Sequence, residues 1–382
     1  MKERCTEFMF ENEGGVKFEA KAANGKIFEF SIGANGKVII KEVSIIDITN
    51  SERTEVSAIE VEDKKDVYSQ LPSVSAGEYA QVLSVYTDED GNKAVIPPGW
   101  TVSGVPSENV IWGKDMGLVI YYIPKDKVSG IDWKNKSEVN GLMETYDQLV
   151  WIPVNMLSAS STLDGIHFHE KFGRMNYQNE ALSIECYYKV PLHYYYEPLV
   201  EELALQKESI DKYGGLYFTR YMISEDKQTG TPRSIKGAMP LRNMSLHIAK
   251  HVAAAMAKSE DFTSHLTYGA EYDTRIKWVI ETRTVSKGEI VEFSACLGNY
   301  KNSNGYPNML VETGSDGCVN NIYGFTGNVK EWTQELKNGG YSVTRGGDFK
   351  DYAQNTPVWS RHYDYGGIVH GNVGIRATFD IK

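Results

Sequence analysis

The chain has 382 residues with a formal net charge of −11, 41% hydrophobic residues, 24 tyrosines and four cysteines. That length and apolar content suit two or three folded domains of about 100–200 residues each and exclude a disordered chain. The acidic balance argues against nucleic acid as a partner, and no apolar run approaches the roughly 18 residues of a membrane-spanning helix. The first residues carry Glu7 and Glu11 where a secretory leader is apolar, so we expect no membrane insertion and no signal peptide on this chain.

Residues 1–95 are predicted to form a β-rich N-terminal module. From residue 16, short runs alternate apolar and polar side chains, and Asn24-Gly25 and Asn35-Gly36 separate these runs. Asn-Gly readily adopts the positive φ angles of a tight hairpin, so the pattern predicts a β meander. The acidic run 88–92 is similar to a calcium loop but lacks the closing glutamate, which favours a hairpin turn between strands near 82–86 and 94–96.

Residues 96–190 are predicted to form a second β-rich module, with strands over 118–123 and 149–154 and a long polar loop over 158–177. His167 and His169 lie in that loop. In a strand, both side chains would face one side and could bind a metal ion, but no third ligand lies nearby in the sequence. We therefore favour a loop without a metal.

Residues 191–382 carry the helical patterns, and their composition predicts an α+β fold. Apolar side chains recur at helical spacing over 197–213, 243–258 and 268–281, and a glycine-rich, strand-like region follows. His247 and His251 lie four residues apart on the second helix, which is the spacing of a paired metal site. Ile248 follows the first histidine where the metalloprotease pattern needs glutamate, so we expect a solvated helix face instead.

Three glycine-containing stretches near the C-terminal end carry further information: GNVKEWT at 327–333, TRGGDF at 344–349 and GNVGIRA at 371–377. Glycine permits close backbone approach, and Trp332 is suited to anchor its segment in a core. Glu331 could hold a cation or cap neighbouring amides, while Arg345 and Arg376 could bridge buried carboxylates or carbonyls. Each stretch taken alone predicts only a structural role.

In this order, the three stretches resemble the formylglycine-generating-enzyme (sulfatase-modifying-factor) domain family, a branch of the C-type lectin fold, whose motifs are GNVWEWT, RGGSW or RGGSF, and a terminal GFR. Residues 215–225, 243–258 and 264–278 are similar to the family's opening strand and first two helices. The resemblance implies a C-type lectin-like domain over 191–382, behind a β-rich N-terminal region.

The chain departs from the enzymes of that family at their metal centres. Those enzymes hold copper with two cysteines shortly after RGG, whereas no cysteine follows Cys318 here, and copper(I) needs thiolate ligands. The iron-dependent branch uses a histidine-rich site, for which His362 and His370 are too few. We therefore expect no enzymatic activity. For calcium, Glu331 and the backbone carbonyls of Gly327 and Val329 match the family's ligands, although Gly324 replaces an expected Asn or Asp. The resemblance thus implies no certain cofactor and leaves calcium binding open.

The segment 348–372 replaces the family's active site, and its aromatic, amide, acidic and glycine residues are typical of a recognition surface. Five consecutive bulky residues, 361–365, cannot all point inward. The alternative is that Phe349, Trp359 and Tyr363 are core residues. The candidate ligand-binding residues are Phe349, Asp351, Tyr352, Asn355, Trp359, Arg361, His362, Tyr363, Asp364, Tyr365 and His370.

This layout also resembles the variable proteins of diversity-generating retroelements, which diversify residues between RGG and the terminal G-x-R and display a ligand-binding face. Residues 96–154 are similar to a module that precedes this domain in prophage proteins of Gram-positive gut bacteria. The resemblance implies a phage-tail or cell-surface receptor that binds a protein or glycan on a cell, as a homo-oligomer such as a trimer. The alternatives are an adhesion protein without diversification and a formylglycine-generating-type oxidase with altered chemistry.

Overall fold

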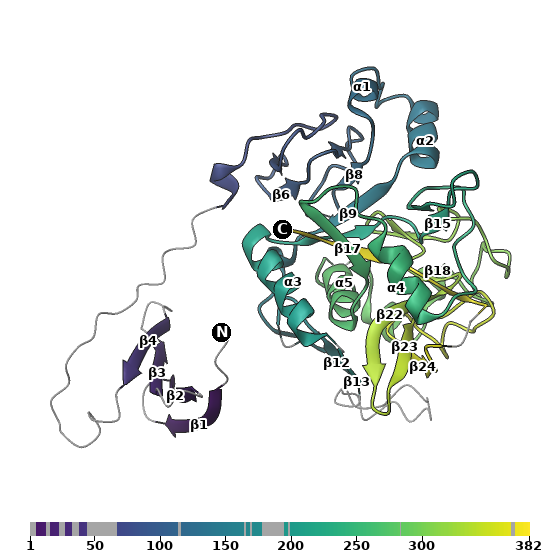
Figure 1. Ribbon diagram of the computed structural model, residues 1–382. Coiled ribbons are helices and arrows are strands. Elements are labelled where there is room, and N and C mark those ends of the chain that lie inside the picture. The colour runs from purple at the N-terminus through teal and green to yellow at the C-terminus, as the bar shows by residue number, and fades with distance from the viewer. Residues whose placement is uncertain are drawn as a thin grey trace, which may run out of the picture. The chain divides into compact units, whose positions relative to one another are not determined.

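The computed structural model describes residues 5–12, 16–22, 27–32, 38–43, 67–113, 116–163, 166–168, 170–177, 195–197, 199–282, 284–367 and 371–382. The chain forms two compact units, Met1–Val67 and Tyr68–Lys382 (Figure 1). The first unit is an antiparallel four-stranded sheet in the order β1-β2-β3-β4. Its strands are β1 (Cys5–Asn12), β2 (Val16–Ala22), β3 (Ile27–Ile32) and β4 (Val38–Val43). This confirms the predicted meander, while its Asn-Gly turns lie outside the described residues.

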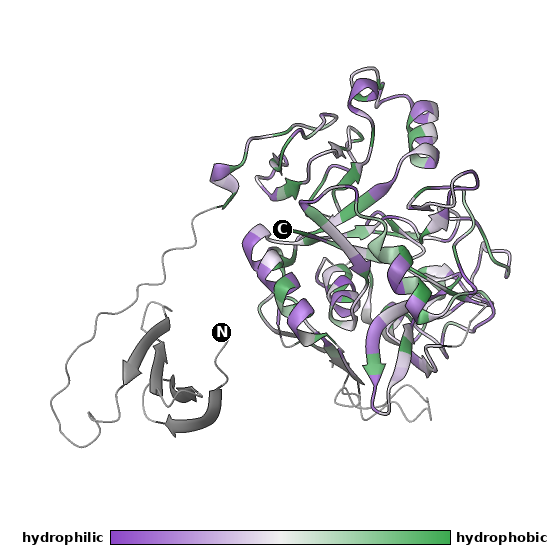
Figure 2. Ribbon diagram, in the orientation of Figure 1, coloured by the Kyte–Doolittle hydropathy of each residue, from purple (hydrophilic) through white to green (hydrophobic). Residues whose placement is uncertain are grey.

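A six-stranded antiparallel sheet forms the centre of the second unit, in the order β17-β26-β14-β9-β8-β7. Its strands are β7 (Thr101–Val102), β8 (Val119–Tyr121), β9 (Gln148–Ile152), β14 (Leu216–Thr219), β17 (Phe262–Leu266) and β26 (Ala377–Ile381). Apart from Gln148 at the start of β9, strands β8 and β9 consist of hydrophobic residues, and both faces of these strands are buried (Figure 2).

A second sheet carries the C-terminal motifs, in the order β13-β22-β23-β24, with β25 pairing in parallel to β22. Its strands are β13 (Tyr195–Tyr196), β22 (Lys330–Lys337), β23 (Tyr341–Arg345), β24 (Arg361–Asp364) and β25 (Val373–Gly374). Strand β24 is the last in this order, so one of its edges carries no further strand of this sheet.

Smaller sheets complete the unit, and the hairpin predicted around residues 82–96 is confirmed as β5–β6. In its turn, the Asp88 carboxylate accepts hydrogen bonds from the backbone amides of Asp90 and Asn92. The remaining strands are β5 (Ser84–Thr87), β6 (Lys93–Ile96), β10 (Ser161–Leu163), β11 (Ile166–Phe168), β12 (Met175–Tyr177), β15 (Ser224–Glu225), β16 (Pro232–Arg233), β18 (Gly298–Asn299), β19 (Cys318–Val319), β20 (Ile322–Tyr323) and β21 (Thr326–Gly327).

The three predicted helices are confirmed with shorter ends as α3 (Val200–Tyr213), α4 (Leu246–Ala254) and α5 (Gly269–Glu281). Helix α3 ends at Gly214, whose φ of +84° favours glycine, and Ser245 caps α4 by accepting from the Ile248 amide. The other helices are α1 (Lys125–Val128), α2 (Lys136–Thr145) and α6 (Lys287–Val291), with 3₁₀ turns η2 (Val67–Gln70), η3 (Val154–Met156) and η5 (Ser294–Cys296). Within the described ranges, none of the helices is long and apolar enough to cross a bilayer.

The three segments expected from the sequence do not coincide with the compact units. The first boundary lies at Val67/Tyr68 instead of 95/96. No boundary falls near residue 190, because β9 of the expected second module pairs directly with β14 of the expected third. Val150, Phe218 and Trp278 share one hydrophobic core across that point. The α+β class itself is confirmed.

Candidate binding surface around strand β24

The residues expected to hold calcium lie in a buried ion network. Glu331 Oε1 lies 3.0 Å from Arg275 Nη2 and 3.4 Å from Arg376 Nε, and the side chains of all three residues are buried. The Gly327 carbonyl accepts a hydrogen bond from the Val329 amide. Two guanidinium groups beside one carboxylate oxygen would repel a divalent cation, so this geometry does not fit the expected calcium site. The suggestion that Arg376 bridges a buried carboxylate fits the structure.

A second buried network joins the RGG motif to α5. Arg345 and Arg361 each contact both Asp273 and Glu335, with N···O distances of 2.5–3.1 Å. Burial alone would raise the pKa of Glu335, but these arginines and Arg174 lower it to about 2. Arg361 therefore pairs with buried carboxylates in the interior. The expectation that Arg361 contacts a ligand does not fit this position.

Trp359 is also an interior residue, since it is 6% exposed and belongs to the main hydrophobic core. The alternative that Trp359 is a core side chain is thus the one the structure bears out. A run of polar and aromatic residues does not by itself show which members face the interior, so composition could not separate Arg361 and Trp359 from their exposed neighbours.

Strand β24 divides the remaining candidates between two faces. Successive side chains of a strand point to opposite sides, so Arg361 and Tyr363 extend from one face and His362 from the other. The antiparallel register places His362 beside Thr344 and Tyr363 beside Val343. Because β24 ends the strand order of its sheet, no further strand of this sheet covers its outer edge.

His362 borders a polar pocket with a volume of about 390 Å³. We define the polar pocket by its lining residues Lys330, Thr344, Asp348, His362, Tyr363, Gly371, Asn372 and Val373. Lys330 Nζ lies 3.1 Å from Asp348 Oδ2 and 2.7 Å from Asp351 Oδ2. Burial lowers the pKa of Lys330, but the two carboxylates outweigh it and raise that pKa, so the ammonium stays charged.

The His362 ring is held neutral within this pocket. Burial lowers the pKa of His362 to about 4, and the nearby Lys330 charge acts in the same direction. Its Nε2 lies 2.9 Å from the carbonyl oxygen of Gly346, which requires the proton to be on Nε2. Near neutral pH the pocket therefore offers a charged ammonium and a neutral imidazole, beside the Asp348 side chain.

Three tyrosines and a lysine gather beside the pocket, and we call them the tyrosine patch: Lys337, Tyr341, Tyr363 and Tyr365. Tyr363 and Tyr365 are 38% and 62% exposed. The Tyr341 ring lies 5.9 Å from the Tyr363 ring and 5.0 Å from the Tyr365 ring, and Lys337 Nζ lies 3.1 Å from the Tyr363 centroid. Lys337 and Tyr341 were not among the sequence candidates. Lys337 of β22 pairs with Tyr341 of β23, and β23 in turn pairs with β24.

The other candidates are only partly brought to this surface. Tyr352 and Asn355 are exposed, and Lys301 Nζ lies 4.6 Å from the Tyr352 ring. Phe349 is half-buried beside Lys350, and Asp351 reaches the pocket through Lys330. The Asp364 side chain and His370 lie outside the described residues.

The histidine pairs considered in the sequence do not complete a metal site among the described residues. His247 and His251 are exposed with their Nε2 atoms 3.1 Å apart, and the described residues supply no third ligand there. His167 lies on β11, but its side chain and His169 fall outside the described residues.

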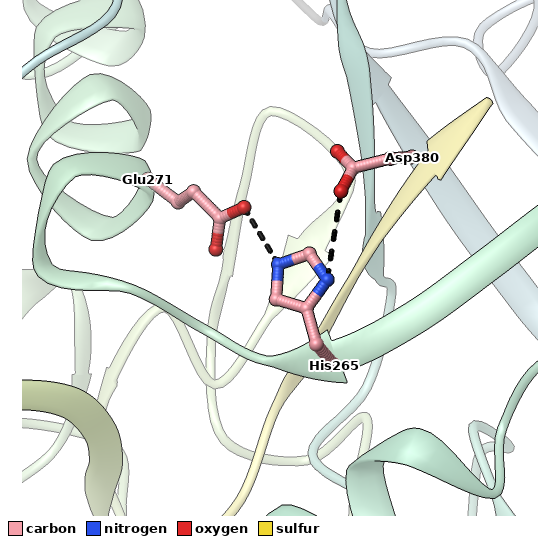
Figure 3. Close-up of side chains that lie close together, drawn as sticks. All are labelled: His265, Glu271 and Asp380. Carbon is pink, nitrogen blue, oxygen red and sulfur yellow. Dashed lines mark hydrogen bonds and ion pairs between the residues drawn. The ribbon is translucent and has the colours of Figure 1, made fainter. Parts of the chain in front are cut away.

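His265, Glu271 and Asp380 form a buried cluster that was not among the sequence candidates (Figure 3). Strand β17, helix α5 and strand β26 each supply one member. His265 Nε2 lies 2.8 Å from Glu271 Oε1, and Nδ1 lies 3.6 Å from Asp380 Oδ2. Because the members are up to 115 positions apart (380 − 265), no local spacing could have predicted the cluster.

No protein-family model and no curated protein sequence matches the chain. Among solved structures, the chain is similar to Treponema denticola variable protein 1, with 14% identity, 43% of this chain and 84% of that chain covered, and a TM-score of 0.31. It is also similar to PvdO from Pseudomonas aeruginosa, with 13% identity, 62% and 95% covered, and a TM-score of 0.39.

Proposed function

We propose that the chain is a non-catalytic binding protein that recognises a ligand with the polar pocket and the tyrosine patch of a C-type lectin-like domain. The exposure of aromatic rings carries this proposal. The most exposed aromatic side chains of the described residues are Tyr196, Phe293, Tyr352, Tyr363 and Tyr365, and three of the five lie within 348–372. Tyrosine supplies rigid contact area with a polar tip, which suits a recognition surface.

The two cysteines whose side chains the structure describes, Cys296 and Cys318, support a binding role over an oxidase. Burial raises the pKa of both the Cys296 and the Cys318 thiols to about 11, so both are protonated at neutral pH. Copper and nucleophilic catalysis need the thiolate. Stoichiometric copper or iron in the purified protein would overturn this part of the proposal, and elemental analysis measures it directly.

The ligand class that fits is a protein or glycan on a cell surface. The pocket offers Lys330, Asp348 and the neutral His362 for polar groups, and the tyrosine patch offers flat rings for apolar or sugar faces. A lectin-like fold by itself does not imply a sugar ligand.

We further propose that the chain is a diversified variable protein. In this role it would act as a homo-oligomer, such as a trimer, on a phage tail or a cell surface. The composition of 348–372 and its position between RGG and the terminal G-x-R support it. The coding DNA tests it: we expect a neighbouring reverse transcriptase gene and a near-copy of codons 348–372 that differs at adenines. Their absence would favour an adhesion protein without diversification.

Binding to intact cells tests the surface itself. Fluorescently labelled protein is incubated with a panel of Gram-positive cells, untreated or treated with protease or periodate to separate protein from glycan receptors. We expect a Tyr363→Ala, Tyr365→Ala double variant to lose at least about tenfold in affinity, which corresponds to about 1.4 kcal/mol.

The matched control is Phe293→Ala, which removes another exposed aromatic ring from a different element. The control should bind as the unmodified protein does, and all variants should melt at the same temperature. Equal binding by the double variant and the unmodified protein would show that the tyrosine patch is not the recognition surface.

A further inference from the structure

A second cavity lies between α3, β17 and β26 and shares no residue with the polar pocket. Its volume is about 510 Å³, and its wall includes Leu205, Gln206, Tyr213, Asp380 and Ile381. Leu205 and Ile381 give the wall an apolar part, whereas Gln206 and Asp380 supply oxygen atoms. The cavity is large enough for a small organic ligand.

Two of these oxygen atoms lack hydrogen-bond partners although they are buried. Gln206 is 3% exposed and Asp380 is 8% exposed, and neither Gln206 Oε1 nor Asp380 Oδ1 has a partner. Buried polar atoms are nearly always satisfied by protein or by a bound molecule. The Gln206 amide oxygen can only accept, and Asp380 Oδ1 accepts when its carboxyl group is ionised, so an occupant that donates hydrogen bonds would satisfy both atoms.

The charges around the cavity favour a cationic donor over a neutral one. The His265 ring faces Glu271 with one nitrogen and Asp380 with the other, so a single positive charge is shared by two carboxylates (Figure 3). Glu202 adds a third carboxylate, which accepts a hydrogen bond from the Tyr268 hydroxyl. Glu208 is a further carboxylate of the lining, and the lysines of the lining are Lys382 and Lys212, whose ammonium lies 4.6 Å from the centroid of the buried Tyr213 ring.

The same geometry argues against a metal ion at His265. A metal bound to one ring nitrogen would need both carboxylates on that side of the ring, whereas they lie at different nitrogens. We propose instead that this cavity binds a primary ammonium group on a short alkyl stem, with N–H donors directed at Gln206 Oε1 and Asp380 Oδ1 and the stem against Leu205 and Ile381.

Calorimetric titration with three probes tests the proposal: n-butylammonium, Nα-acetyl-lysine methylamide and n-butyltrimethylammonium. The first two carry N–H donors, as a free amine and as a lysine side chain, and the third has the same charge without donors. We expect a primary ammonium to bind at least about tenfold more tightly than the quaternary one. If the lysine probe binds more weakly than butylammonium, the natural occupant is a free amine. If the two bind equally well, the natural occupant is a lysine side chain.

Gln206→Leu should weaken butylammonium binding at least about tenfold, whereas the exposed control Gln228→Leu should leave it unchanged. Equal affinity for primary and quaternary probes, unchanged binding by Gln206→Leu, or no binding of either amine would overturn the proposal. If Gln206→Leu does not fold, nuclear Overhauser contacts between butyl protons and the Leu205 and Ile381 methyl groups of the unmodified protein decide the question. Their absence at saturating amine would equally overturn it.

Discussion

Arg361 shows, among single residues, why composition could locate the candidate surface but could not assign its members. It stands next to His362 in a run of bulky polar side chains, yet its guanidinium pairs with Asp273 and Glu335 in the interior. The partners come from α5 and β22, far away in the sequence. Only the strand register tells which members of the run face the helix.

Arg361→Ala is expected to destabilise the fold, because it leaves two buried carboxylates short of a partner. The loss should be about 3–5 kcal/mol in the free energy of unfolding. Tyr365→Ala, on the exposed side of the same segment, should change it by less than about 0.5 kcal/mol. Urea unfolding monitored by tryptophan fluorescence measures both, and similar losses for the two variants would contradict this division.

The His265 cluster predicts a pH dependence of stability. Burial would lower the pKa of His265, but Glu271 and Asp380 outweigh it and raise the pKa to about 9. The protonated ring therefore stabilises the fold fully below about pH 6.5, and this contribution is lost as the pH rises to about 9. Burial raises the pKa of Asp380 to about 7. The stabilisation that the protonated Asp380 carboxyl gives the fold is therefore lost as the pH rises from about 4 to about 7.

We expect the free energy of unfolding to fall by up to about 3 kcal/mol between pH 6.5 and 9. In His265→Gln, which lacks the titrating ring, the fall over the same window should be much smaller. Urea unfolding at several pH values measures both slopes. A flat curve for the unmodified protein, or the same slope in the variant, would show that the ring does not titrate as described.

At the scale of elements, the sequence predicted what local patterns determine and missed what distant pairing determines. Helices α3 and α5 were predicted because their apolar side chains recur on one face, and α3 stops at a glycine. Helix α2 was missed because, of its ten residues, only Val139 and Leu142 are buried. The pairing of β9 with β14 could not be predicted from local patterns, since it joins segments more than sixty residues apart.

The end of α3 gives a prediction at this scale. At Gly214 a Cβ atom would meet the Tyr68 hydroxyl, and the φ of +84° is already unfavourable for alanine. Gly91 has a nearly identical φ of +85° with open space around it. Gly91→Ala should cost about 1 kcal/mol of stability and Gly214→Ala at least about 1 kcal/mol more. Equal losses in urea unfolding would show that Tyr68 does not restrict this helix end.

For the whole molecule, the two units each complete their own sheets. A variant that begins at Val67 should therefore keep the core of the second unit and the hydrogen bond from Tyr68 to the Tyr213 carbonyl. Its melting temperature should match the corresponding transition of the full chain within about 2 °C, measured by calorimetry. A drop of more than about 5 °C, or aggregation, would show that the first unit contributes to the stability of the second.

The arrangement of β24 has a consequence for how the sequence can change during evolution. Arg361 at the start of the strand is fixed in the interior, whereas Tyr363 near its end and Tyr365 just after it are exposed. Residues that hold the backbone are thus separate from residues that can be exchanged. A lineage could replace the outer side chains generation after generation without losing the scaffold, so new specificities can be sampled at little risk to folding.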